Sequence, residues 1–334
     1  MAEIEILNDD VLREIFSYLN LRDRVRMGLV CKKWQNVHKS MMRSIHKMYC
    51  DVYHHICEPV VKPSVDILNN VLVLSICTRP YLAKRLKKFA SNLHTIVIHD
   101  TECDCYMLYK FYRLLPKCTK LKSAQLNCNI PMTATAFLQF LPTDNLENLS
   151  INMSFRPYPI VISELSELMR KVLAKSRKLK SLNVRKMPIS KGSWAELIRK
   201  CRKLHTIRID SEFSLPENIL KEMMSLQNLR NLFLYAYSGS YETWHQFSNL
   251  ENICILQFNQ PYSLPTKNQI KSFLQRSRNL KTYYFFSNKL TEMVQQVASD
   301  IGHECKKNDF EYLDEWIHII PPLPQNTYFF SKLD

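Results

Sequence analysis

The chain has 334 residues, of which 46% are hydrophobic and 23% charged, a balance typical of globular proteins with room for more than one domain. Its four glycines are too few for a Gly-rich phosphate loop or a dinucleotide-binding turn, and no apolar run approaches the ~20 residues of a membrane span. The N-terminus, MAEIEILNDD, lacks a basic-then-apolar signal, so we expect a cytosolic or nuclear protein.

The eleven cysteines are expected to be reduced in such a compartment. Two clusters combine cysteine with histidine: Cys50, His54, His55 and Cys57, and then His99, Cys103 and Cys105. Neither has the paired spacing of a zinc site, so we expect buried thiols, no metal and no cofactor.

The first organised region, residues 7–37, contains three short amphipathic segments. In residues 9–20 the apolar positions follow a helical spacing, and Asp9 and Asp10 stand where a helix N-terminus favours negative charge. Further segments span residues 21–29 and 30–37. About 30 residues are too few to bury a core of their own, so this unit is expected to dock on another surface.

This region closely resembles the F-box, whose pattern has a Leu-Pro start, an Ile-Phe-Ser-Tyr-Leu segment and a Val-Cys-Lys/Arg-x-Trp end. The chain reads Leu7, Asp10, Val11, Leu12, Ile15 to Leu19, Asp23 and Val30 to Trp34 at these positions. It departs at Asn8, where proline is usual, and at Arg24, where leucine is common. Asn8 is still able to cap a helix. The alternative is an amphipathic helical hairpin packed on its own domain.

The resemblance implies a three-helix module at residues 1–45 that binds a Skp-type adaptor. The residues expected to face the adaptor or to close the module are Leu7, Asp10, Val11, Leu12, Ile15, Phe16, Leu19, Val30, Cys31 and Trp34. Residues 46–66 are expected to form a helical linker that ends before Pro59.

From residue 67 to 303 one phrase returns, with apolar residues in the pattern apolar-x-x-apolar-x-apolar. Its copies begin at Val71, Leu93, Leu121, Leu146, Leu179, Leu204, Leu229, Leu250 and Leu280. Nine copies make eight intervals, which average about 26 residues, and such a period is typical of leucine-rich repeats.

Helix-like stretches stand between several phrases, as in residues 81–90, 163–176, 194–201 and 218–225. We therefore predict an α/β solenoid of about nine irregular repeats with a parallel sheet on its concave side. A doubly wound sheet also alternates strands with helices, but it does not repeat one phrase at a near-constant period. This part resembles the leucine-rich repeats that follow an F-box in one subfamily, although only Asn127 and Asn152 clearly match the usual asparagine. Residues 304–334, with an acidic stretch at 309–315 and prolines at 321–324, are expected to form a cap or tail.

Strand alternation assigns one set of residues to the concave face. In the later repeats this set is basic and aromatic, which are the residue types that protein interfaces favour. The predicted substrate-binding residues are Arg185, Arg208, Phe233, Tyr235, Tyr284 and Phe286. In the opposing interpretation the tail covers these aromatics, or the register is shifted by one residue.

The net charge of +15 is concentrated in four clusters, at residues 117–122, 170–186, 199–208 and 276–281. Cations near helix C-termini complement the helix dipole, and stacked repeats would arrange them as a basic ridge. Acidic or phosphorylated protein partners are favoured over nucleic acid, because no nucleic-acid-binding motif accompanies the charge.

No catalytic motif is found, so we expect a non-catalytic protein. The resemblance implies the substrate-recognition subunit of an SCF-type (cullin-RING) ubiquitin ligase, which holds a protein substrate on its repeats. The alternative is an interaction scaffold outside the ligase, associated with nucleic acid through the basic ridge.

Overall fold

The computed structural model describes residues 7–19, 26–43, 47–50, 73–77, 90–100, 112–153, 159–187, 189, 191–215, 217–237, 244–257, 264–285, 288–307 and 328–329. The chain divides into two compact units, Met1–Lys122 with Ile320–Asp334, and Ser123–Ile319, and each is described by itself. Within the described ranges, no helix is both long and apolar enough to cross a membrane.

The second unit alternates strands with helices. Its strands are β4 (Ser123–Cys128), β5 (Asn148–Met153), β6 (Ser181–Arg185), β7 (Thr206–Leu215), β8 (Asn231–Tyr237), β9 (Asn252–Gln257), β10 (Thr282–Phe285) and β11 (Lys306–Lys307). Its α-helices are α7 (Pro131–Phe140), α8 (Pro159–Lys175), α9 (Lys191–Lys200), α10 (Glu217–Met224), α11 (Lys267–Arg276) and α12 (Asn288–Asp300). Between β8 and β9 the described connection is a short 3-10 helix, Trp244–Gln246.

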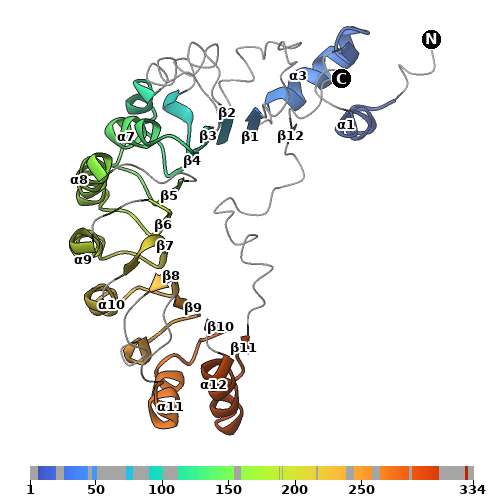
Figure 1. Ribbon diagram of the computed structural model, residues 1–334. Coiled ribbons are helices and arrows are strands. Elements are labelled where there is room, and N and C mark those ends of the chain that lie inside the picture. Colours follow the sequence, from blue (N-terminus) through green and yellow to red (C-terminus); the bar gives the residue numbers. More distant parts are fainter. Residues whose placement is uncertain are drawn as a thin grey trace. The chain divides into compact units, whose positions relative to one another are not determined.

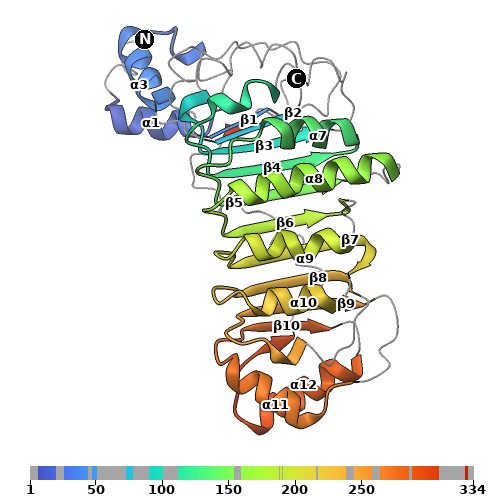
Figure 2. The same cartoon turned by 90° about the vertical axis from the view of Figure 1, so that its left-hand side faces the viewer.

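The strands of this unit pair in chain order from β4 to β11, and their ladders are parallel. The helices all lie on one face of the sheet (Figure 1). Figure 2 shows the strands as successive rungs with the helices in front of them. The other face, which we call the helix-free face, is formed by strand side chains that point away from the helices.

The first unit contains α1 (Asp9–Ser17) and α3 (Lys32–Arg43), followed by β1 (Lys47–Cys50), β2 (Val73–Cys77) and β3 (Thr95–Asp100). Two 3-10 helices, Ala90–Asn92 and Leu115–Lys117, flank β3 in the sequence, and β12 (Tyr328–Phe329) pairs with β1. The strand order is β3-β2-β1-β12, and β1 and β2 are parallel.

The repeated phrase predicts the strands correctly, because each of its nine copies leads into one of the strands β2 to β10. In the eight copies from Leu93 to Leu280, the first leucine of the phrase lies before the strand, and the other two apolar residues lie in the strand. In the copy that leads into β6 these residues are Leu179, Leu182 and Val184, all of which are buried. Burial of each such side chain contributes about 1.5–3 kcal/mol. The phrase therefore supplies a regular part of the core, and helix residues such as Phe137, Leu165 and Leu197 supply another part.

The repeats stack in phase. Leu149 of β5 pairs with Leu182 of β6, Leu182 with Ile207 of β7, and Ile207 with Leu232 of β8. Because each phrase position meets its own equivalent on the next strand, the buried side chains form continuous rows. The expected α/β arrangement of a parallel sheet with helices is therefore confirmed.

The predicted helical linker is wrong at residues 47–50, which form β1 instead of a helix. Their backbone pairs with β2, from Lys47 beside Val73 to Cys50 beside Ile76. An open strand edge offers unpaired backbone groups, and pairing with it satisfies the donors and acceptors of this segment. Residues 51–66 lie outside the described part of the chain.

The predicted C-terminal cap or tail also begins with a strand, since Lys306 and Lys307 pair with Thr282 and Tyr283 of β10. The acidic stretch at 309–315 and the prolines at 321–324 lie outside the described residues. So do the cysteine and histidine clusters except Cys50 and His99. Among the described residues, no group of three His, Cys, Asp or Glu side chains is placed to hold a metal ion.

Candidate protein-interaction surfaces

The first helix begins at a side-chain cap. Asn8 has an extended backbone, and its Oδ1 accepts a hydrogen bond from the Val11 N–H at 2.8 Å. Asp9 and Asp10 fill the first turn, where their charge complements the helix dipole. The expected capping role of Asn8 is therefore confirmed, and it replaces the proline that is usual in the F-box.

A small apolar cluster joins α1 to α3. Leu12, Phe16, Trp34 and Val37 are buried, and the Phe16 and Trp34 rings meet edge to face with their centroids 5.5 Å apart. Leu7, Leu19, Met27, Cys31 and Met41 are partly buried against this cluster. Nearby, a Cβ on Gly28 would lie 3.0 Å from the His38 ring, so the turn before α3 packs closely on that helix.

Other apolar side chains of the same region remain exposed. Val11 and Ile15 are 42% and 40% exposed, and they lie one turn apart on α1. Tyr18 continues their stripe and is exposed, and its hydroxyl donates a hydrogen bond to Glu14 at 2.9 Å, which raises the pKa of the Tyr18 phenol. In the turn before α3, Leu29 and Val30 are exposed as well.

The structure thus separates the core residues of this region from its exposed residues, which the sequence could not do. Of the ten predicted residues, Leu12, Phe16 and Trp34 are core residues, and Leu7, Leu19 and Cys31 pack against that core. Val11, Ile15, Val30 and the carboxylate of Asp10 are exposed.

The prediction missed Tyr18 and Leu29, two exposed apolar residues of the same region. A signal for Tyr18 was its position three residues after Ile15 on one helical face, whereas Leu29 had none. Two of the three expected helices are described, since residues 20–25, with Asp23 and Arg24, lie outside the described part.

On the helix-free face of the second unit, the side chains form rows across the strands. Asn183 pairs in register with Arg208, Arg208 with Phe233, Phe233 with Cys254, and Cys254 with Tyr284. A neighbouring row contains Arg185, Asp210 and Tyr235. Five of the six predicted substrate-binding residues therefore come together on four strands, and Phe286 lies outside the described residues.

Arg208 is buried, with 6% of its surface exposed. Its Nη2 donates to the Tyr235 hydroxyl at 3.2 Å, and the guanidinium carbon lies 5.2 Å from the centre of the Tyr235 ring. Burial lowers the pKa of Arg208 and raises that of Tyr235, because removal from water disfavours the charged form of each group. Tyr235 therefore acts as a polar and aromatic partner of Arg208.

Phe233 and Cys254 form a second buried cluster, against which Tyr235 and Tyr284 pack. Burial raises the pKa of the Cys254 thiol to about 12. The sequence predicted an open surface of anchor residues here. That expectation needs correction, because Arg208 and Phe233 are more than nine-tenths buried, whereas Tyr235 and Tyr284 keep partial exposure.

Arg185 is similarly engaged within the sheet. Its Nε lies 3.5 Å from Oδ2 of Asp210, its register partner on the next strand, and both side chains keep about a fifth of their surface exposed. Arg185 was predicted to bind a carboxylate or phosphate of a partner. Such an anion would have to compete with Asp210 of the same sheet. The single-strand pattern gave no sign of this pairing.

A third row at the start of the strands forms a polar ladder that the sequence analysis missed. Asn231 Nδ2 donates to Thr206 Oγ1 at 3.0 Å, and Asn252 Nδ2 donates to Asn231 Oδ1 at 2.6 Å. Thr282 Oγ1 then donates to Asn252 Oδ1 at 2.6 Å. The recurrence of Thr or Asn two residues after the turn leucine was the available signal.

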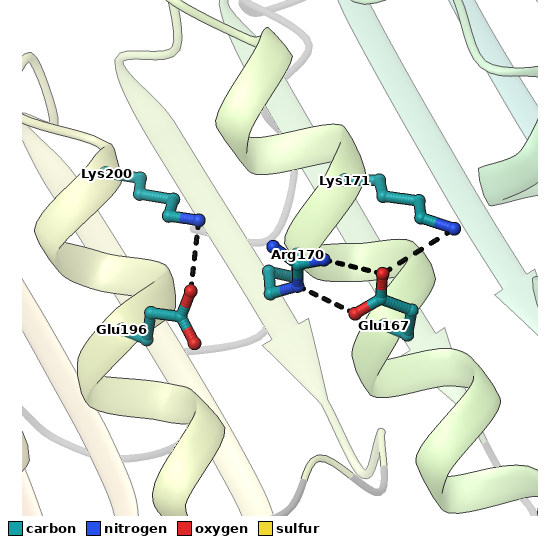
Figure 3. A network of polar contacts seen from close by, with 5 residues as sticks. All are labelled: Glu167, Arg170, Lys171, Glu196 and Lys200. Carbon is teal, nitrogen blue, oxygen red and sulfur yellow. Dashed lines mark hydrogen bonds and ion pairs between the residues drawn. The ribbon is translucent and has the colours of Figure 1, made fainter.

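The predicted basic ridge is interrupted rather than continuous. In the turns before the strands, Lys180 pairs with Glu147 at 2.7 Å and Lys281 with Glu251 at 2.8 Å. On the helix surface, Glu167 accepts two hydrogen bonds from Arg170 and lies 3.5 Å from Lys171 (Figure 3). Many of the cations are therefore neutralised by acids of the same or the next repeat.

Comparison with known proteins gives a family for the first region only. Residues 4–43 match the F-box domain family. No curated protein matches the chain.

Among solved structures, the chain is similar to the one described as the crystal structure of the Rad7 and Elc1 complex in yeast. The TM-score is 0.40 and the sequence identity 13%, over 84% of this chain and 89% of that chain. A likeness at this level carries no argument about function. The family match agrees with the buried Leu12–Phe16–Trp34 cluster and with the capped start of α1. Residues 4–43 of this chain are therefore an F-box domain.

Proposed function

We propose that this protein is the substrate-recognition subunit of an SCF-type (cullin-RING) ubiquitin ligase and performs no bond chemistry itself. The observation that carries the proposal is an F-box domain whose first helix leaves Val11 and Ile15 exposed on one face. Its F-box would bind a Skp-type adaptor, and its repeats would hold a protein substrate. The gain in rate would come from proximity, because two reactants held together react as if at high concentration.

We infer further that the strand–helix units are leucine-rich repeats. The turn leucine before each strand from β4 to β10 is buried, which is the packing role that this residue has in such repeats. Support for a substrate site comes from the helix-free face, where Arg185, Tyr235 and Tyr284 keep partial exposure beside the buried Arg208 and Phe233. Tyrosine and arginine are the residue types that concentrate binding energy at interfaces.

Adaptor binding is tested by co-expression with a Skp-type adaptor. The surface variant Val11→Asp/Ile15→Asp should lose the complex while the protein stays folded, because both side chains are exposed. Met132→Asp is the matched control, since Met132 is an exposed apolar side chain of α7 in the second unit. Retention of the adaptor by the Val11→Asp/Ile15→Asp variant would contradict the proposal.

Substrate binding is tested on the adaptor complex by comparing proteins captured by the wild type and by Arg185→Ala/Tyr284→Ala. These two positions retain exposure, whereas a change at Tyr235 would also remove the partner of Arg208. The expected result is loss of specific captured proteins with unchanged adaptor content. An identical set of captured proteins would assign substrate binding to another surface.

A further inference from the structure

Two neighbouring turns of the second unit carry the same pair of cations. Arg177 and Lys178 precede β6, and Arg202 and Lys203 occupy the equivalent positions before β7. All four are exposed, and the next residue in each turn is a buried leucine. Because β6 and β7 pair directly, with Ser181 beside Thr206, the two turns stack at about the 4.8 Å spacing of adjacent strands. We call these four residues the basic turn pair.

Among the described residues, the basic turn pair differs from the helices beside it in having no acidic partner. On α8 and α9, Arg170 pairs with Glu167 and Lys200 with Glu196 (Figure 3), and Arg199 pairs with Glu222 of α10.

Within the described residues, no carboxylate lies within ion-pair distance of any of the four turn cations. Lys178 Nζ instead donates to the neutral amide of Asn145, at 2.6 Å. Four like charges at this spacing repel one another, so the surface is complementary to an anion.

Helix dipoles account for only part of this charge. The dipole favours cations within the last helical turn, which applies to Lys175 at the end of α8. The basic turn pair lies beyond the helix ends, where that effect has fallen away. On the side toward β5 the neighbouring turn contains Asp144 and Glu147, and Glu147 is already engaged by Lys180. Acidic residues of the neighbouring turn therefore lie next to the cationic surface but do not neutralise it.

A pocket between α7 and α8 reaches the same edge of the unit. It has a volume of about 360 Å³, which is at the small end of the range for ligand pockets. Leu138, Leu141, Leu168 and Val172 line its apolar part, and the polar lining residues are Gln139, Thr143, Glu164, Lys171 and Lys175. Lys175, which lines the pocket, is only two residues before Arg177 of the basic turn pair.

We propose that this surface binds an acidic protein segment that carries an apolar anchor side chain. The basic turn pair would contact the carboxylates, and the pocket would take the anchor. Single-stranded nucleic acid is the weaker fit, because no aromatic ring lines the pocket to stack on a base. The turns and the helices α7 and α8 are separate from the helix-free face, so the proposal does not depend on the ligase function proposed above.

The test uses the full chain and two fluorescein-labelled peptides of Asp, Glu and Ser that differ only in a central Leu-Phe or Ser-Ser pair. The charge-reversal variant Arg177→Glu/Lys178→Glu/Arg202→Glu/Lys203→Glu should bind the Leu-Phe peptide about tenfold more weakly, or worse, at low salt. The matched control is Lys271→Glu/Arg278→Glu/Lys289→Glu/Lys307→Glu, which changes the net charge equally at exposed positions outside the surface. Equal weakening in the control would reduce the effect to net charge and overturn the proposal.

A second variant tests the pocket without altering the turns. Gln139 is an exposed residue that lines the pocket, and Gln139→Trp should obstruct it. The expected result is weaker binding of the Leu-Phe peptide and unchanged binding of the Ser-Ser peptide. Failure of the wild type to distinguish the two peptides would overturn the proposal. Tighter, steeply salt-dependent binding of single-stranded DNA that displaces the Leu-Phe peptide would replace the acidic segment with nucleic acid.

Discussion

The F-box helices and the strand–helix repeats differ in how completely they bury their apolar side chains. In α1, Val11 and Ile15 remain 42% and 40% exposed, whereas Leu182, Ile207 and Leu232 of the repeats are fully buried. A repeat is closed by the next repeat, because each phrase position pairs with its equivalent one strand away. In the described part of the chain, α1 and α3 do not belong to such a repeating series. An amphipathic stripe therefore marks a core in the repeats and, in the F-box, both a core and a surface available to a partner.

The largest effect is expected within the F-box itself. Phe16 is fully buried and contacts Trp34, so Phe16→Ala should cost about 3–5 kcal/mol of free energy of unfolding. Val11→Ala, on the exposed stripe, should cost about 0.5 kcal/mol or less. Hydrogen exchange of the α1 and α3 amides measures both. Equal protection in the two variants would mean that the exposed and buried classes are not distinct.

The two units can also be compared by the reactivity of one cysteine thiol in each. Burial raises the pKa of Cys254 from the ordinary value of 9.0 to about 12, so its reactive thiolate is about 10³-fold rarer than for an ordinary thiol. Cys31 in the F-box is half-buried. Alkylation at pH 8 followed by peptide mass spectrometry should label Cys31 long before Cys254. In denatured protein the two alkylation rates should converge. Comparable rates in the folded protein would show that the buried cluster of Phe233 and Cys254 opens.

The polar ladder should contribute less than a core residue. Asn252→Ala removes the donor to Asn231 Oδ1 and the acceptor for the Thr282 hydroxyl, which leaves two groups without these partners. A loss of about 1–3 kcal/mol in the free energy of unfolding is expected from denaturant titration. Asn228→Ala, in an exposed turn of the same unit, is the control. If both variants are equally stable, the ladder has no structural role.

The strands could be predicted because the phrase that forms them is local and recurs in phase. The capping role of Asn8 was also a local property, which needed only its position before α1. β1 was not predictable in this way, since its strand conformation depends on pairing with residues 73–76 far along the chain.

The candidate surfaces were predicted only in part, for a related reason. Alternation within a strand placed Arg208 and Phe233 on the helix-free face. Their burial also involves Tyr235 of β8, Cys254 of β9 and Tyr284 of β10. In the F-box, the helical spacing placed Leu12 and Val11 on one apolar face of the first helix. Which of them faces α3 depends on how the two helices meet. Tertiary contacts, rather than local pattern, decide between core and surface in both cases.

The smallest effect concerns two surface ion pairs of equal sequence spacing, one in each unit. Arg13 contacts Asp10 of α1 through one hydrogen bond of 3.1 Å, whereas Arg170 makes two hydrogen bonds to Glu167 of α8, at 2.7 and 2.6 Å. The hydrogen bonds from Arg170, together with the charges of Arg170 and Lys171, lower the pKa of Glu167 from 4.5 to about 2. Because the folded pKa lies below the unfolded one, the pair stabilises the fold above pH 4.5, and that contribution is lost as the pH falls toward 2.

An NMR titration of the Glu167 carboxylate should therefore have its midpoint near pH 2. In Arg170→Gln the midpoint should return toward 4.5, whereas Lys171→Gln should shift it less, because Lys171 lies 3.5 Å from the carboxylate. Arg13→Gln should leave the acid stability of the second unit unchanged, because Arg13 lies on α1 in the first unit. A midpoint near 4.5 in the wild type would show that the two-bond geometry is not maintained in solution, and would remove the distinction between the two ion pairs.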